Sequence, residues 1–235
     1  SDVYKRQILL LLRLPILVVH ILVGLFTILF FPKEPKNFKN SHYRIMMLWM
    51  NILSSILGIK VDIRGIPDQS ANLFVSNHVT YLDIIIINKL LPVNFIAKEE
   101  ISSWPVIGRL ASKTGTLFIK RGDNVESSKM IYEMEERFKL QNKIVFFPEG
   151  KIGNGKRVRK FHYKLFKSIE NKELYIQPIA VRYPTGYPLN NNYSEIISDK
   201  SLKGEMFSLY LKFLMRRRSH VILIFLDKVS TRDYK

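Results

Sequence analysis

The sequence predicts an α/β fold, a mixed sheet covered by helices on both faces, with an apolar N-terminal helical segment for membrane attachment. Short apolar runs that are rich in β-branched and aromatic residues alternate with longer segments typical of helices. A long apolar stretch precedes the first of these runs. We therefore expect membrane-associated helices over residues 8–57 and an α/β domain over residues 58–235. The first seven residues, SDVYKRQ, match no pattern in the rest of the chain and are excluded from the predicted fold.

The apolar N-terminal stretch runs from Leu14 to Phe31. As a helix it would extend about 27 Å, slightly less than a hydrocarbon core of about 30 Å. Pro15, His20 and Gly24 favour a shallow or re-entrant segment at least as well as a full span. Arg13 can extend its charge to the interface. Basic residues precede the stretch as in a signal peptide, but no cleavage pattern comes after it, so we expect it to stay in the mature chain.

The remaining elements follow in order along the chain. Ser41 is a suitable N-cap for an apolar helix that ends near Leu57. The first strand alternates apolar and polar residues, as expected at a half-exposed position, whereas the others are short apolar runs. The predicted strands are 59–66, 72–76, 94–97, 116–120, 143–147, 174–181 and 220–226, and the predicted helices between them are 80–91, 102–113, 125–140, 161–171 and 202–217.

The chain is strongly basic and contains no cysteine. Lys and Arg number 37 against 20 Asp and Glu, a net charge of +17, which indicates polyanionic surroundings such as lipid headgroups or nucleic acid. The absence of cysteine excludes disulfides, thiolate metal sites and a cysteine nucleophile. No helix-turn-helix, zinc-finger or RNP pattern supports nucleic acid, so membrane anchorage is favoured. The densest basic run comprises Lys151, Lys156, Arg157, Arg159, Lys160, Lys164 and Lys167.

The stretch SNHVTYLD contains two titratable groups, His78 and Asp83. Thr80 and Asp83 have the spacing of a helix capping box, so a purely structural role is one interpretation. Five helical positions rotate side chains by about 500°, so the pair can meet only if His78 lies in the turn before the helix. There the carboxylate would orient the imidazole, which would accept a proton from a hydroxyl. Because no G-x-S-x-G elbow occurs, that hydroxyl would belong to the substrate, and we expect no metal at this site.

Two other segments are candidates for binding. Phe147-Pro148-Glu149-Gly150 follows an apolar strand, where open α/β sheets place their sites, although an ordinary turn has the same composition. Glu149 at such a position could hold an acceptor headgroup, and Gly150 permits close backbone approach. Arg121 ends another apolar strand, where it could receive a phosphate or simply be solvated.

Four blocks occur together in the chain: Asn77-His78-x4-Asp83, the strand from Gly115 to Arg121, FPEG at 147–150, and QPIAV at 177–181. With these blocks in this order, the chain resembles the lysophosphatidic acid acyltransferase family over roughly residues 61–229. The resemblance implies a membrane-bound enzyme that moves a fatty acyl group from a thioester to the free hydroxyl of lysophosphatidic acid, giving phosphatidic acid.

The resemblance also implies roles for individual residues. His78 would be the general base, Asp83 would orient it, and Arg121, Glu149 and Gly150 would bind the acceptor headgroup. Acyl-CoA or acyl carrier protein would be the thioester co-substrate, with no further cofactor. The active site is expected on the cytoplasmic side of the membrane. The remaining candidate substrate-binding residues are Asn77, Gly115, Phe118 and Lys151.

One segment departs from the family pattern. The family usually continues the FPEG block with Thr and then Arg or Ser, whereas this chain has Lys151-Ile152-Gly153. Lys151 could pair with a phosphate as a flexible point charge. The Asn154-Gly155 turn after it and the pattern at 161–166 are similar to the branch that acylates lyso-ornithine lipids, an alternative acceptor. An alternative of another class is a non-catalytic basic membrane adaptor.

Overall fold

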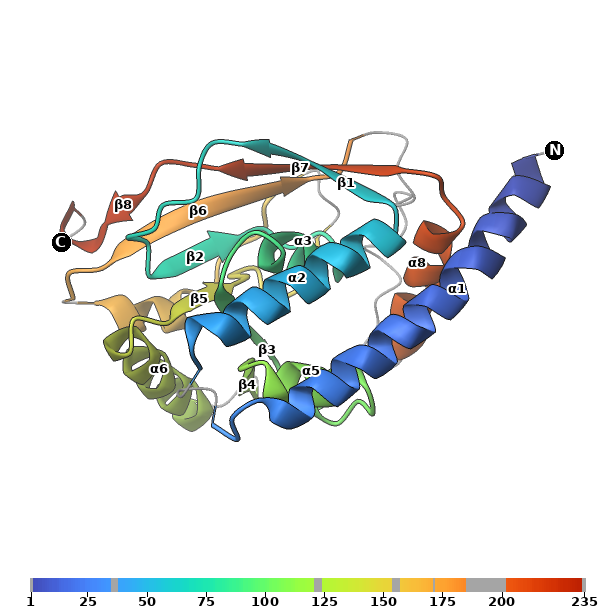
Figure 1. Cartoon of the computed structure of the whole chain (residues 1–235). Helices are drawn as coiled ribbons and strands as arrows, with labels where there is room; N and C mark the ends of the chain where they lie inside the picture. The colour runs from blue at the N-terminus through green and yellow to red at the C-terminus, as the bar shows by residue number, and fades with distance from the viewer. Residues whose placement is uncertain are drawn as a thin grey trace.

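The computed structural model describes residues 2–34, 38–120, 124–153, 157–170, 172–184 and 202–233. They form an eight-stranded sheet of order β1-β7-β6-β2-β5-β3-β4, with β8 paired to β6 (Figure 1). All pairs are parallel except β6–β7 and β6–β8, so the predicted mixed sheet is confirmed. The strands are β1 (Ile59–Arg64), β2 (Leu73–Ser76), β3 (Val93–Lys98), β4 (Leu117–Ile119), β5 (Lys143–Phe146), β6 (Tyr175–Arg182), β7 (Ser219–Phe225) and β8 (Val229–Ser230).

Helices cover both faces of the sheet, as the sequence predicts. Successive side chains of a strand point to opposite faces. In β2, Phe74 therefore packs with α2, α3 and α8, whereas Leu73 and Val75 pack with α6 and η3. Full burial of such a side chain stabilises the fold by roughly 1.5–3 kcal/mol. The helices are α2 (Asn40–Ile56), α3 (Leu82–Asn88), α4 (Glu99–Ser102), α5 (Ile107–Lys113), α6 (Asn124–Lys139), the 3-10 helix η3 (Tyr163–Ile169) and α8 (Leu202–Leu214).

Three adjacent strands, β6, β2 and β5, run parallel in the middle of the sheet. Their carboxyl ends therefore lie at the same edge, and the segments that come after them meet there. The chain leaves β2 toward α3, leaves β5 through the FPEG turn, and leaves β6 at residue 183. This edge is where the topology places a site.

The N-terminal helix α1 (Asp2–Thr27) lies along α2 and α8 (Figure 1). It begins within the seven residues that the predicted fold excludes, and it continues through Pro15. Arg13 does not extend to an interface as expected: its guanidinium donates to the carbonyls of Arg216 (2.5 Å) and Arg217 (3.1 Å), just after α8. These carbonyls lack helical partners, so the guanidinium satisfies them.

A second contact attaches α1 to α2 through Trp49. The Trp49 ring stacks on His20 at 4.4 Å, and each residue's ring nitrogen bonds to the other's carbonyl. Gly24 makes room for the indole, because a Cβ there would lie 2.6 Å from Trp49 Nε1. The outer side of α1 stays exposed and apolar, and Val3–Phe30 is long and apolar enough to cross a membrane by length and composition.

Several predicted boundaries are wrong. The helix expected from Ser41 starts at Asn40, with Lys39 as its N-cap. The helix expected over 102–113 is broken into α4 and α5 because Pro105 lacks an N–H and its ring blocks the preceding turn. In the described part of the helix predicted over 161–171, Tyr163–Ile169 form the 3-10 helix η3 rather than an α-helix, and the two-residue strand β8 was not predicted.

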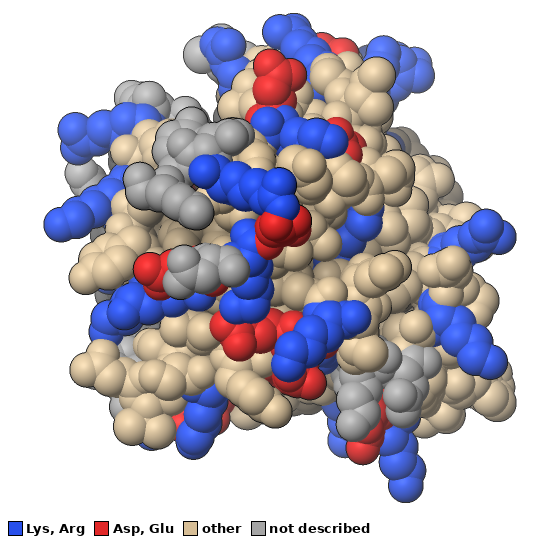
Figure 2. Space-filling view, turned by 90° about the vertical axis from the view of Figure 1, so that its left-hand side faces the viewer, with Lys and Arg blue, Asp and Glu red and all other residues tan. Residues whose placement is uncertain are grey.

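Basic side chains are spread over the surface. On the side of the molecule at the left of Figure 1, Lys and Arg stand at several separate places with Asp and Glu among them (Figure 2). Lys129 and Lys139 of α6 each pair with a glutamate one turn away. Such exposed pairs contribute at most about 1 kcal/mol each, so they add little to the stability of the fold.

Candidate active site

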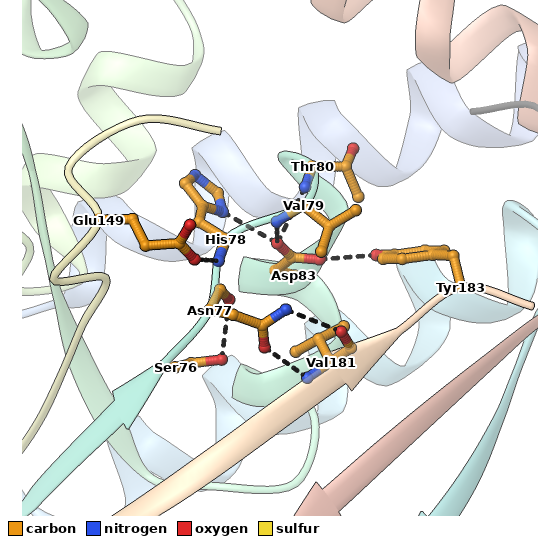
Figure 3. Close-up of polar contacts among 9 residues, drawn as sticks. All are labelled: Ser76, Asn77, His78, Val79, Thr80, Asp83, Glu149, Val181 and Tyr183. Carbon is orange, nitrogen blue, oxygen red and sulfur yellow. Dashed lines mark hydrogen bonds and ion pairs between the residues drawn. The ribbon is translucent and has the colours of Figure 1, made fainter. Parts of the chain in front are cut away.

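His78 and Asp83 meet at the carboxyl edge of the three central strands (Figure 3). His78 lies two residues after β2, in the turn before α3, and Asp83 lies in the first turn of that helix. Nδ1 of His78 is 2.9 Å from Oδ2 of Asp83, and the His78 side chain is 14% exposed. With Nδ1 donating to the carboxylate, Nε2 carries the lone pair that can accept a proton.

Asp83 is fully buried, and both of its carboxylate oxygens accept hydrogen bonds. Oδ2 also accepts the backbone N–H groups of Val79 (2.7 Å) and Thr80 (2.9 Å), and Oδ1 accepts the hydroxyl of Tyr183 at 2.7 Å. Among the described residues no Lys or Arg bonds to it. Neutral donors and the N-terminus of α3 therefore stabilise its charge.

Only half of the predicted capping box forms. Asp83 accepts the N–H of Thr80, as a box requires, but Oγ1 of Thr80 is buried without a partner among the described residues. The helix begins at Leu82, with Tyr81 as its N-cap. Asp83 thus supports the turn and faces His78 with the same oxygen.

Glu149, after β5, joins two loops by backbone contacts. Its Oε1 accepts the N–H of His78 (3.1 Å) and its Oε2 accepts the N–H of Arg159 (2.9 Å), and it is 4% exposed. Gly150 follows with φ 65°, a left-handed backbone conformation that residues with a side chain rarely adopt. This conformation closes the turn. Gly153 then donates its N–H to the carbonyl of His78. This glutamate therefore fixes the turn that presents the imidazole.

A small open cavity of about 120 Å³ lies beside the pair. Phe147 stacks on the imidazole at 4.0 Å between ring centres, which limits rotation of the ring. Among the described lining residues, Arg157 is the one Lys or Arg. The lining residues are Asn77, His78, Val79, Glu149, Gly153, Arg157 and Val158.

Asn77 lines this cavity, but its amide is already bonded at both ends. Nδ2 donates to the carbonyl of Val181 (2.9 Å), and Oδ1 accepts the N–H of Val181 (2.7 Å). The side chain extends the β2–β6 pairing by one step and holds the turn in place. Its predicted substrate contact stays a prediction.

Of the other predicted substrate-binding residues that the structure describes, Gly115, Phe118 and Lys151 do not line the cavity. Gly115 (φ 88°) and Phe118 belong to the turn and strand of β4, three strand spacings from β2, or about 14 Å. Lys151 is exposed and does not line the cavity. Arg121 lies outside the described residues. Their roles stay predictions.

Sequence reasoning missed three residues near the pair: Tyr183, Phe147 as a stacking partner, and Arg157 as a cavity residue. Tyr183 carried only a weak signal, because it lies two residues after the predicted strand 174–181, and that this strand lies beside the one before His78 is known from the structure alone. Arg157 was recognised only as part of a basic run, since its approach depends on the path of the loop after β5. No group of His, Asp and Glu in the described part of the chain is arranged to hold a metal ion.

Comparisons with known proteins identify relatives of this chain by sequence and by fold. The model of the Acyltransferase family matches residues 59–182. The lyso-ornithine lipid O-acyltransferase of Pseudomonas aeruginosa is 34% identical over 140 residues, 60% of this chain and 54% of that protein. The 1-acyl-sn-glycerol-3-phosphate acyltransferase of Neisseria gonorrhoeae is 30% identical over 147 residues, 62% of this chain and 57% of that protein. The chain thus spans about half the length of the curated relatives it matches.

A solved structure shares the fold. The crystal structure of the 1-acyl-sn-glycerophosphate (LPA) acyltransferase from Thermotoga maritima superposes with a TM-score of 0.65 at 16% identity. The match covers 100% of this chain and 89% of that one.

Proposed function

Because the chain belongs to the acyltransferase family, we propose that it transfers a fatty acyl group from a thioester to the free hydroxyl of a lysolipid. The observation that carries the proposal is the 2.9 Å contact between Asp83 and His78, with His78 on the wall of a cavity. A basic membrane adaptor would have no need of a fully buried carboxylate that orients an imidazole. We keep the adaptor as the alternative that an activity measurement excludes.

The proposed step uses this chain's own imidazole. Nε2 of His78 takes the proton of the acceptor hydroxyl while the oxygen of that hydroxyl attacks the carbonyl carbon of the thioester. The C–S bond then breaks, the new ester C–O bond remains, and the imidazolium returns the proton to the departing thiolate. Asp83 stabilises the imidazolium and keeps the proton on Nδ1 beforehand. Proton transfer of this kind contributes about a hundred- to ten-thousand-fold in rate.

We propose that Arg157 recognises an anionic group of the acceptor. It is the one Lys or Arg among the described residues that line the cavity, and its planar guanidinium can bind a phosphate or a carboxylate through two parallel hydrogen bonds. Lysophosphatidic acid, the acceptor implied by the family resemblance, offers a phosphate. A lyso-ornithine lipid offers a carboxylate, and relatives at 34% and 37% identity that carry this name favour it as the second candidate.

The N-terminal helix supports a location at the membrane. Contacts from Arg13 to Gly24 hold α1 against α8 and α2, a stretch of about 16 Å along the helix. We propose that α1 rests its exposed apolar side in one leaflet while its inner side stays on the domain. Both ends of α1 then remain on the side of the membrane that holds the active site, which we place in the cytoplasm with its thioester donor.

The acceptor is decided by a direct competition. Purified protein in mixed micelles receives one acyl-CoA or acyl carrier protein thioester and equal amounts of lysophosphatidic acid and lyso-ornithine lipid, and products are identified by mass. Phosphatidic acid as the main product supports the first acceptor, and ornithine lipid supports the second. Consumption of neither acceptor with any donor contradicts the proposed reaction.

A further inference from the structure

Tyr183 contacts the catalytic pair from a distant part of the chain. Its hydroxyl donates to Oδ1 of Asp83 at 2.7 Å, across 100 residues of sequence (Figure 3). Tyr183 directly follows β6, whereas Asp83 lies in the first turn of α3. The two other segments of the site, after β2 and β5, do not supply a donor to this oxygen among the described residues.

The two oxygens of Asp83 are served unequally. Oδ2 accepts three N–H groups, all from the turn at residues 78–80, whereas Oδ1 has the phenol as its donor in the described structure. Asp83 is fully buried, so water cannot easily replace a lost partner. Among the described residues, removal of the hydroxyl would leave this carboxylate oxygen buried without a donor.

We propose that Tyr183 is a positioning residue of the reaction, which keeps Asp83 ionised and in plane with the His78 imidazole. The inference rests on the proposed function and adds a residue to its site. The strand β6 thereby contributes to the chemistry through Asp83, without touching the substrate itself. Tyr183 also ties the end of β6 to the start of α3, which closes the edge of the site.

The electrostatic consequence has a definite sign. While Nε2 of His78 is unprotonated, the His78–Asp83 pair carries one negative charge. Once Nε2 has accepted a proton, the pair is neutral. A hydroxyl that donates to the carboxylate favours the charged state, so its loss makes the pair hold the proton more tightly. In a variant without the hydroxyl, the imidazole is therefore protonated, and can no longer act as a base, at a higher pH than in the wild type. The other titratable or charged described residues around the pair and its turn are Glu149, Arg157, Tyr81 and Tyr210.

The test compares Tyr183→Phe with Tyr43→Phe. Tyr43 is a matched control, because its buried hydroxyl bonds to Asn94 (3.0 Å), on β3, and not to the catalytic pair. Turnover is measured against pH for each variant, together with KM for the acceptor and thermal unfolding. For Tyr183→Phe we expect about a tenfold lower kcat near neutral pH, a KM within about twofold, and an acidic limb about one pH unit higher. For Tyr43→Phe we expect a lower unfolding temperature with the wild-type pH profile.

A second measurement separates this inference from the proposed function. The titration of the His78 imidazole is followed by NMR, with its signal identified by its loss in His78→Ala. If the wild type transfers no acyl group, the proposed function fails. The effect of the Tyr183 contact can still be tested, because Tyr183→Phe should raise the titration midpoint of the His78 imidazole. An unchanged midpoint and an unchanged pH profile in Tyr183→Phe would overturn the inference. If Tyr183→Phe does not fold, Tyr183→Leu, which also lacks the donor, is titrated instead, and an upward shift of the His78 midpoint supports the inference while an unchanged midpoint overturns it.

Discussion

Oδ2 of Asp83 lies 2.9 Å from Nδ1 of His78, although five positions separate the two residues on the chain. The turn between them makes this possible, because its N–H groups at Val79 and Thr80 bond to the same oxygen. The carboxylate therefore shapes the turn that carries the imidazole and also orients the imidazole. Structure and chemistry depend on one side chain, so substitutions there affect both.

Asp83→Asn removes the charge while keeping the shape. An amide nitrogen facing Nδ1 or the turn would oppose donor to donor, and the imidazole would lose the partner that fixes its tautomer. We expect kcat to fall about a hundred- to ten-thousand-fold and the free energy of unfolding to fall by about 1–3 kcal/mol. Initial rates and urea unfolding check both effects. Activity within a few-fold of wild type would contradict the role of Asp83 as orienter.

Glu149→Gln tests the link between the two loops. One of the two backbone donors, at His78 or Arg159, would then face an amide N–H group. We expect a loss of about 1–3 kcal/mol in the free energy of unfolding and a lower kcat, because the turn with the imidazole shifts. Glu136→Gln on α6, which removes an exposed pair with Lys139, is the control and should leave kcat unchanged. Equal kcat values for the two variants would contradict the role of Glu149 in holding the turn that carries His78.

Arg157→Ala tests recognition of the acceptor anion. A charge-assisted hydrogen bond is worth about 1.5–3 kcal/mol, so the KM for the acceptor should rise at least about tenfold while kcat changes little. Arg159→Ala is the matched control, because Arg159 touches the site through its backbone N–H and its side chain is exposed. Steady-state kinetics with both lysolipids measure the difference. A KM unchanged by Arg157→Ala, or raised equally by Arg159→Ala, contradicts the assignment.

The position of α1 predicts a labelling pattern. The chain has no cysteine, so single cysteines at Gln7 and Lys39, both exposed, report on the two ends of the N-terminal segment. If α1 rests in one leaflet, a membrane-impermeant maleimide reaches both positions from the same side of sealed vesicles. Labelling from opposite sides would show that α1 crosses the bilayer.

Much of the fold follows from the sequence because its strands are short apolar runs with little internal ambiguity. The alternation of Leu73, Phe74 and Val75 between the two faces shows why: each neighbour finds an apolar helix on its own side. Boundaries were less predictable where a single residue decides them, as Pro105 does between α4 and α5. The polar contacts of α1 could not be predicted either, since they depend on carbonyls just after α8, about 200 residues away.

The contact between His78 and Asp83 was predictable from spacing, whereas most of the residues that support it were not. A histidine followed by an aspartate before a helix suggests the pair, and the structure brings His78 and Asp83 together. Tyr183 and Arg157 approach the pair only through the order of the strands and the path of a loop. Glu149 lines the cavity, and its contact with the acceptor stays a prediction; the backbone N–H groups that both of its oxygens accept could not be predicted from the sequence.

The most direct test of the central claim is acyl transfer by His78→Ala beside His220→Ala. His220 is exposed at the start of β7, two strands away from β2, does not line the cavity beside His78, and controls for the loss of a histidine. Both variants and the wild type are incubated with a thioester donor and the two lysolipids, and acylated product is quantified by mass. The account predicts wild-type turnover for His220→Ala and a loss of at least about a hundredfold for His78→Ala, with both variants folded and bound to vesicles. Near-normal turnover by folded His78→Ala would contradict it.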